Sequence, residues 1–145
     1  MRVMLMIKGD PEQGAIPSAE LLTAMGRYND DLEQAGLLVD LAGLLPSAEG
    51  RQVRFSGGRR AVINGPFDDP KKLIAGYWNL QVKSMDDAVE WAKRAPFEAL
   101  SRIYPGEYGA EGEIEIRPVF ELESPDASNQ RSDATAMPAQ GAQLE

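Results

Sequence analysis

The chain has 145 residues, carries 23 Asp and Glu against 15 Lys and Arg, and contains neither Cys nor His. The acidic balance argues against binding to nucleic acid or to an anionic membrane surface. The missing Cys and His exclude disulfides, thiolate chemistry and histidine-based proton transfer. We expect one domain over residues 1–122 and a disordered polar tail over 123–145. No apolar run approaches the roughly 20 residues that cross a bilayer, so we expect a cytoplasmic protein, and we expect no metal or other cofactor.

Hydrophobic patterning predicts four strands of a sheet and one separate hairpin. Alternating or continuous apolar residues favour sheet strands near 2–8, 37–45, 75–82 and 113–121. Between the second and third of these, Gly57-Gly58 predicts a tight turn joining two hairpin arms at 51–55 and 60–63.

Two helices are predicted between the strands. The first begins at Ser18 and runs to about Ala35, with four residues on its buried stripe at three- and four-residue spacing: Leu21, Met25, Tyr28 and Leu32. The second begins at the capping residue Ser84 and ends before Pro96. A further short turn of helix is expected within 97–104.

This order of elements is that of a ferredoxin-like α+β domain, the split βαβ pattern, with the hairpin as an insertion. Two helices then cover one face of an antiparallel sheet. The apolar side chains expected to face these helices alternate along three of the strands: Val3, Leu5, Ile7, Trp78, Leu80, Val82, Ile114, Ile116 and Phe120.

The opposite face of the sheet would carry a mixture of apolar and polar side chains: Met4, Met6, Tyr77, Asn79, Gln81, Glu115 and Arg117. Such a face is too apolar to lie fully in water and too polar to form a dry core. A homodimer in which two such faces meet around a partly polar cavity satisfies both requirements. The sequence therefore predicts a homodimer through the sheet face, with room for a small anionic or aromatic ligand.

Several separated motifs resemble one known family. They are Asn64-Gly65-Pro66-Phe67 followed by Asp69 and Lys71, then Gly76-Tyr77, and finally Glu115-Ile116-Arg117-Pro118-Val119. In this order, over residues 1–122, they resemble the YCII-related family, in particular its branch named for an Asp-Gly-Pro-Phe motif. The resemblance implies a dimeric α+β barrel, and it allows a regulatory protein as a partner.

Some members of that family have a His-Asp pair in the cavity on the sheet face, and one branch catalyses dehalogenation or related small-molecule chemistry. This chain departs from the pattern because it has no His, and because Asn64 stands where the motif has Asp. A His-Asp mechanism is therefore excluded for this chain.

Asp40 is the best candidate for a catalytic residue. It is the single acid in an apolar strand, where burial would make its carboxylate a stronger base. A solvated or ion-paired Asp at a strand edge is the alternative. Candidates for contacts with a ligand are Tyr28, Asn64, Phe67, Lys71, Tyr77 and Arg117.

Each candidate for a ligand contact also has a structural explanation. Asn64 and Phe67 would serve a turn and the edge of the core, and the two tyrosines would pack with their hydroxyls already bonded. Lys71 and Arg117 suit an anion, and Arg117 equally suits an ion pair with Glu115 of the partner subunit.

Two classes of function remain open from the sequence. In the first, the dimer is a small-molecule binding or sensing protein whose ligand lies in a cavity on the sheet face. In the second, it is a cofactor-independent isomerase, lyase or oxygenase that uses Asp40 or a Tyr for proton transfer and Arg117 or Lys71 to hold an anion. Convergence of Asp40, Tyr77 and Arg117 in one enclosed pocket would favour the enzyme.

Overall fold

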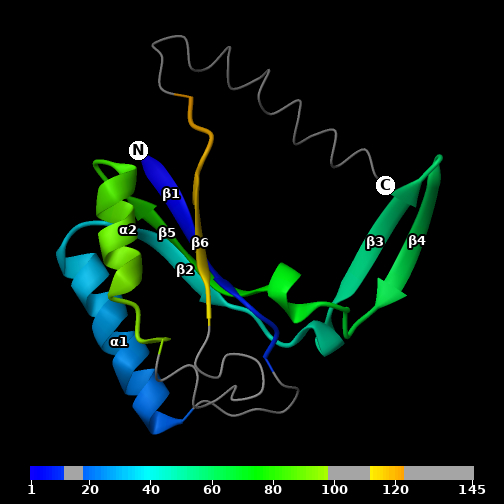
Figure 1. The fold of residues 1–145 in the computed structure, drawn as a ribbon, viewed down its shortest axis with the longest axis horizontal. Coiled ribbons are helices and arrows are strands. Elements are labelled where there is room, and N and C mark those ends of the chain that lie inside the picture. The colour runs from blue at the N-terminus through cyan, green and yellow to red at the C-terminus, as the bar shows by residue number, and fades with distance from the viewer. Residues whose placement is uncertain (12–17, 98–111, 123–145) are drawn as a thin grey trace.

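The computed structural model describes residues 1–11, 18–97 and 112–122. Figure 1 shows an antiparallel sheet, two helices and a separate hairpin. In chain order the elements are β1 (Arg2–Lys8), α1 (Ala19–Gln34), β2 (Leu38–Gly43), the 3₁₀ turn η1 (Ser47–Glu49), β3 (Arg51–Ser56), β4 (Arg59–Asn64), the 3₁₀ turn η2 (Pro70–Lys72), β5 (Ile74–Gln81), α2 (Met85–Lys93) and β6 (Ile114–Pro118).

Both helices begin at the serine caps that the sequence predicts. The Ser18 hydroxyl accepts a hydrogen bond from the Leu21 amide at 3.0 Å, and the Ser84 hydroxyl accepts one from the Asp87 amide at 3.1 Å. Helix α1 ends at Gln34, and Gly36 follows with a φ of 74°, so that the amides of Gly36 and Leu37 donate to the carbonyls of Glu33 and Leu32.

The sheet has the strand order β2-β5-β1-β6, and each neighbouring pair is antiparallel. Helix α1 carries the chain from the inner strand β1 to the edge strand β2, and α2 carries it from β5 to the other edge strand, β6. This is the split βαβ topology, so the predicted ferredoxin-like α+β fold with an inserted hairpin is confirmed.

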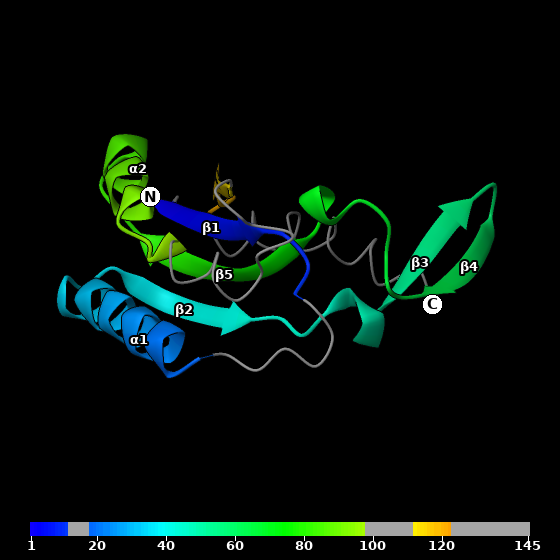
Figure 2. The ribbon, with the colours of Figure 1, turned by 60° about the horizontal axis from the view of Figure 1, so that its bottom comes forward.

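The core lies between the sheet and the two helices (Figures 1 and 2). In the register of the sheet, Leu5 lies opposite both Trp78 and Ile116, so these side chains share one face. The residues buried there come from β1, β5, the two helices and the segment between β5 and α2: Val3, Leu5, Ile7, Leu21, Tyr28, Leu32, Trp78, Leu80, Val82 and Ala88. We call this side of the sheet the covered face and the other side the open face.

One predicted core residue is wrong. Phe120 is 78 % exposed and lies beyond β6, which ends at Pro118. The physical reason is the length of the neighbouring strand: β1 begins at Arg2, whose carbonyl accepts from the Val119 amide, and no strand remains beside Phe120. All but the first residue of the predicted helical turn at 97–104, and the whole of the predicted tail at 123–145, lie outside the described residues.

The hairpin of β3 and β4 stands away from the sheet and the helices (Figure 2). Six cross-strand pairs join its arms, from Arg51 opposite Asn64 to Ser56 opposite Arg59. Gly57 and Gly58 have φ values of 54° and 82°, which a two-residue hairpin turn requires. The predicted hairpin is confirmed.

Candidate functional site

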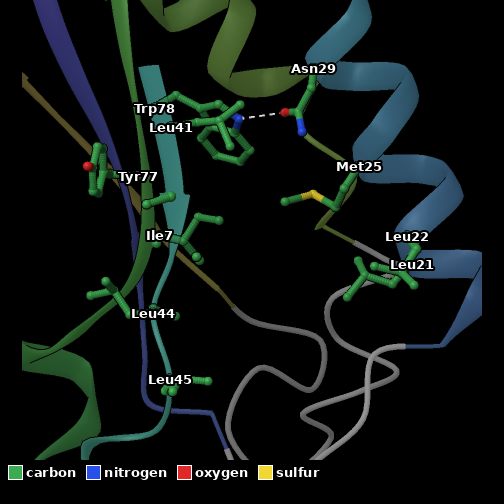
Figure 3. Close-up of a pocket in the computed structure, with 14 residues that line it drawn as sticks. Ile7, Leu21, Leu22, Met25, Asn29, Leu41, Leu44, Leu45, Tyr77 and Trp78 are labelled. Atoms are coloured by element: carbon green, nitrogen blue, oxygen red, sulfur yellow. Dashed lines mark hydrogen bonds between the residues drawn. The ribbon is translucent and has the colours of Figure 1, made fainter. Parts of the chain in front are cut away.

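A cavity of about 330 Å³ lies between helix α1 and strands β2 and β5, and Figure 3 shows it in close-up. We call it the α1–β2 pocket. It occupies the edge of the covered face, where α1 stands off from β2. Its apolar lining is made by Ile7, Leu21, Leu22, Met25, Leu41, Leu44, Leu45, Ala75 and Trp78. Among these residues, Leu22 and Leu45 are 61 % and 72 % exposed.

Few polar groups reach this pocket. Asn29 accepts a hydrogen bond from the Trp78 indole N–H at 2.8 Å, which leaves the Asn29 amide N–H₂ as a donor near the wall. Tyr77 also lines the pocket, but Figure 3 shows its side chain on the other side of the strands from Trp78 and Met25, toward the open face. Among the described lining residues, none is Asp, Glu, Lys or Arg. The pocket therefore suits an uncharged, largely apolar molecule.

Tyr28 lies behind this pocket in the core. Its ring meets Trp78 edge to face at 5.1 Å, and its hydroxyl donates to the Trp91 carbonyl at 2.7 Å. Desolvation by burial raises the pKa of Tyr28 to about 12, against a smaller lowering by the Arg94 charge. The hydroxyl is therefore neutral at pH 7 and already donates to a carbonyl. Contact with a ligand, predicted from the sequence, stays a prediction.

The Asn64-Gly65-Pro66-Phe67 motif joins the root of the hairpin to the first loop of the chain. The Ser47 hydroxyl donates to the Asp10 carboxylate and accepts from the Phe67 amide at 3.0 Å, and the Ser47 amide donates to Asp10 at 2.7 Å. A Cβ on Gly65 would overlap the Ser47 carbonyl oxygen, so only Gly fits there. We call Asp10, Ser47, Gly65 and Phe67 the loop latch.

A second cavity of about 380 Å³ adjoins this loop latch. Phe67 and Asp10 line it together with Leu44, Pro46, Leu73 and other residues near them. Asn64 is exposed at the end of β4, outside this lining. The motif thus has a structural explanation, and whether Asn64 or Phe67 also contacts a ligand stays a prediction.

The open face carries the predicted catalytic residue. Asp40 is exposed on the edge strand β2, where its carboxylate accepts from the Asn79 amide at 2.6 Å. The burial that would make it a stronger base is therefore absent within one chain. Asp40 matches the alternative of a solvated Asp at a strand edge.

Arg117 lies on the same face at the opposite edge. One row across the four strands consists of Asp40, Asn79, Met4 and Arg117, so Asp40 and Arg117 are about 14 Å apart by three strand spacings. Arg117 pairs with Glu115 of its own chain at 3.3 Å. Tyr77 lies in the next row, opposite Met6. The three groups do not converge within one chain.

Lys71 lies exposed in the turn η2 and is outside the lining of the α1–β2 pocket. The seven predicted site residues are thus spread over the core, the end of β4, the loop latch, the open face and η2. The sequence missed Met25, Leu41 and Leu45 as pocket residues, because the pocket depends on the distance between α1 and β2. It also missed the Asp10–Ser47 contact, because nothing local connects residues 37 positions apart.

Together the fold and its pocket define a ferredoxin-like α+β protein with an apolar cavity between one helix and the sheet. The YCII-related domain family matches residues 1–123, and the chain therefore belongs to the YCII-related family. An uncharacterized protein of Rhizobium meliloti (strain 1021) is 30 % identical over 86 residues, which are 59 % of this chain and 62 % of that relative. The matched part thus spans less than two thirds of the relative. Membership of the Asp-Gly-Pro-Phe branch stays a prediction.

Within residues 1–11, 18–97 and 112–122, no helix combines the length and the apolar character needed to cross a membrane.

Proposed function

We propose that this protein binds a small, uncharged, ring-containing molecule in the α1–β2 pocket. One observation carries the proposal: a cavity of about 330 Å³ whose described lining is apolar apart from Asn29 and the Trp78 indole N–H. Its volume is at the lower end of the range of about 300–1,000 Å³ that is typical of ligand sites. The flat Trp78 ring and the flexible Met25 side chain favour an aromatic ligand.

Binding is better supported than catalysis. A general acid or base must lie within hydrogen-bond distance of the reacting group, and no Asp, Glu, Lys or Arg belongs to the described lining of this pocket. The enzyme alternative relied on Asp40, Tyr77 and Arg117, and these lie on the open face without converging. The apolar lining also favours an aromatic ligand over an anionic one.

We also propose that the protein is a homodimer through the open face. Met4, Met6 and Tyr77 are only half-buried there, although each lies in the middle of a sheet row. Pairing two such faces removes this apolar surface from water, and at about 25 cal/mol per Å² it favours association. The α1–β2 pocket lies on the other side of the sheet and stays accessible in such a dimer.

Isothermal titration calorimetry with indole as the uncharged probe and benzoate as the anionic probe tests the binding site. We expect indole to bind once per chain and benzoate to bind at least about tenfold more weakly. Met25→Trp fills the pocket and should weaken indole binding by about tenfold or more. Arg27→Trp is the matched control, because it adds the same side chain on the exposed side of α1, outside the lining.

Equal indole affinity of Met25→Trp and Arg27→Trp would contradict this site, as would tighter binding of benzoate than of indole. Sedimentation velocity tests the dimer separately. Met6→Glu places a charge in the centre of the open face and should make the protein monomeric. Arg27→Glu, on the exposed side of α1, should leave the protein dimeric.

A further inference from the structure

The β3–β4 hairpin exposes apolar side chains far from the core. Val53 and Val62 face each other across the two strands and are 51 % and 64 % exposed, and Phe55 is 45 % exposed on the same side. Figures 1 and 2 both show the hairpin projecting away from the sheet and helices. A two-stranded hairpin with an uncovered apolar side is marginally stable in water. This side of the hairpin therefore favours a partner.

The charge of the hairpin is opposite to that of the chain as a whole. Four arginines lie within its two strands, and none of the chain's 23 acidic residues lies in 51–64, although the net charge of the whole chain is −8. Arg51 and Arg60 lie on the same side of the hairpin as Val53 and Val62, and Arg54 and Arg59 lie on the other side. A basic arm on an acidic protein is complementary to the body of a second copy of the same protein.

The length of the hairpin also fits a second copy. Its arms have six residues each and extend about 20 Å at 3.3 Å per residue, whereas two sheets packed face to face lie about 10 Å apart. The hairpin is rooted between β2 and β5, at one end of the open face, where the Gly65 amide donates to the Gly50 carbonyl at 3.0 Å. An arm rooted at the end of one open face can therefore reach past the interface.

We propose that the β3–β4 hairpin is a docking arm: it binds the acidic body of a second copy of the chain, and this contact stabilises the homodimer. The pair Val53 and Val62 supplies the apolar contact, and Arg51 and Arg60 on the same side supply the charge complementarity. The inference rests on the proposed dimer through the open face, and it assigns a specific function to the insertion in the ferredoxin-like fold.

Sedimentation equilibrium at low and moderate salt tests this arm with matched charge variants. Arg51→Glu/Arg60→Glu reverses two charges on the side of the hairpin that carries Val53 and Val62, and we expect the dimer dissociation constant to rise at least about tenfold. Lys71→Glu/Lys72→Glu makes the same change in net charge on exposed residues of η2 and should alter the constant less than about threefold. Val53→Thr/Val62→Thr keeps the strand preference and should also weaken the dimer.

Three outcomes overturn the arm. If the hairpin variants dimerise like the wild type while Met6→Glu is monomeric, the arm fails and the proposed dimer stands. If the wild type is monomeric at millimolar concentration, the proposed dimer fails and the arm fails with it. If a 20-base-pair DNA duplex binds at 0.15 M salt and Arg51→Glu/Arg60→Glu abolishes that binding, the basic hairpin binds nucleic acid instead.

Hydrogen exchange gives a second readout that needs no variant. In the docked arm, the amides of residues 53–62 should exchange more slowly above the dimer dissociation constant than below it. Exchange in this segment that does not depend on protein concentration would contradict the inference.

Discussion

The two faces of the same sheet differ in burial, although the same strands supply the side chains of both. On β1, Val3 and Leu5 point to the covered face and are fully buried, while Met4 and Met6 point to the open face and are half-buried. The residues alternate one by one along the strand, so the difference comes only from what covers each face. Two helices cover one face, and within one chain no helix or strand among the described elements packs on the other.

The covered face is itself not uniform. Near β1 and the centre of β5 it is closely packed, and Leu80 and Leu32 are fully buried. Toward β2, the helix α1 is not in close contact with the strand, and the α1–β2 pocket lies between the two. The same layer thus supplies both the core and the proposed ligand site. Substitutions on each side of the sheet test this comparison, and they are given from the largest expected effect to the smallest.

Leu5→Ala should have the largest effect. Leu5 is fully buried between β5, β6 and the helices, and truncating such a side chain costs about 2–5 kcal/mol of unfolding free energy. Met6→Ala, the next residue on the open face, should cost less than about 1 kcal/mol in the monomer. Urea unfolding at low protein concentration measures both. Equal losses would show that the two faces do not differ as described.

Gly65→Ala should follow, because the new Cβ overlaps the Ser47 carbonyl in the loop latch. We expect a loss of at least about 2 kcal/mol, as for other backbone positions that a side chain cannot fit. Gly26→Ala is the matched control, since a Cβ at Gly26 meets nothing within 4 Å. There, in the middle of α1, Ala should stabilise the protein. Similar unfolding midpoints for the two variants would contradict the close approach at Gly65.

Tyr28→Phe should have an intermediate effect. It removes the hydrogen bond to the Trp91 carbonyl and should cost about 1–2 kcal/mol at pH 7. The folded protein holds the Tyr28 proton more tightly than the unfolded chain, because burial raises its pKa from 10.0 to about 12. This contribution is complete below pH 10 and is lost as the pH rises toward 12. The wild type should therefore lose stability faster than Tyr28→Phe in this range, and parallel curves of unfolding free energy against pH would contradict it.

Asp40→Asn should have the smallest effect on folding. Asp40 is exposed on an edge strand and bonds only a neighbouring side chain among the described residues, Asn79. We expect a change of about 0.5 kcal/mol or less, as for most surface substitutions, and unchanged indole binding. A large loss of indole affinity would move the site to the open face and revive the proposed role of Asp40.

Local patterns predicted most of the fold. Alternation along β1 separated Val3, Leu5 and Ile7 from Met4 and Met6, and Ser18 and Ser84 marked the helix starts, because these features depend on neighbouring residues. The end of β6 was placed at residue 121 instead of Pro118, and Phe120 was therefore assigned to the core, because the end of β6 depends on where β1 begins. The pocket was not predicted at all, because it depends on the distance between α1 and β2, which no sequence period encodes.

Methionine methyl resonances test the central claim most directly, because they report both faces at once. In a ¹³C-methyl spectrum of the protein, Met25 lies in the α1–β2 pocket, and Met4 and Met6 lie on the open face. Titration with indole should shift the Met25 signal and leave Met4 and Met6 unchanged. Shifts of Met4 and Met6 without a shift of Met25 would place the ligand on the open face and contradict the account.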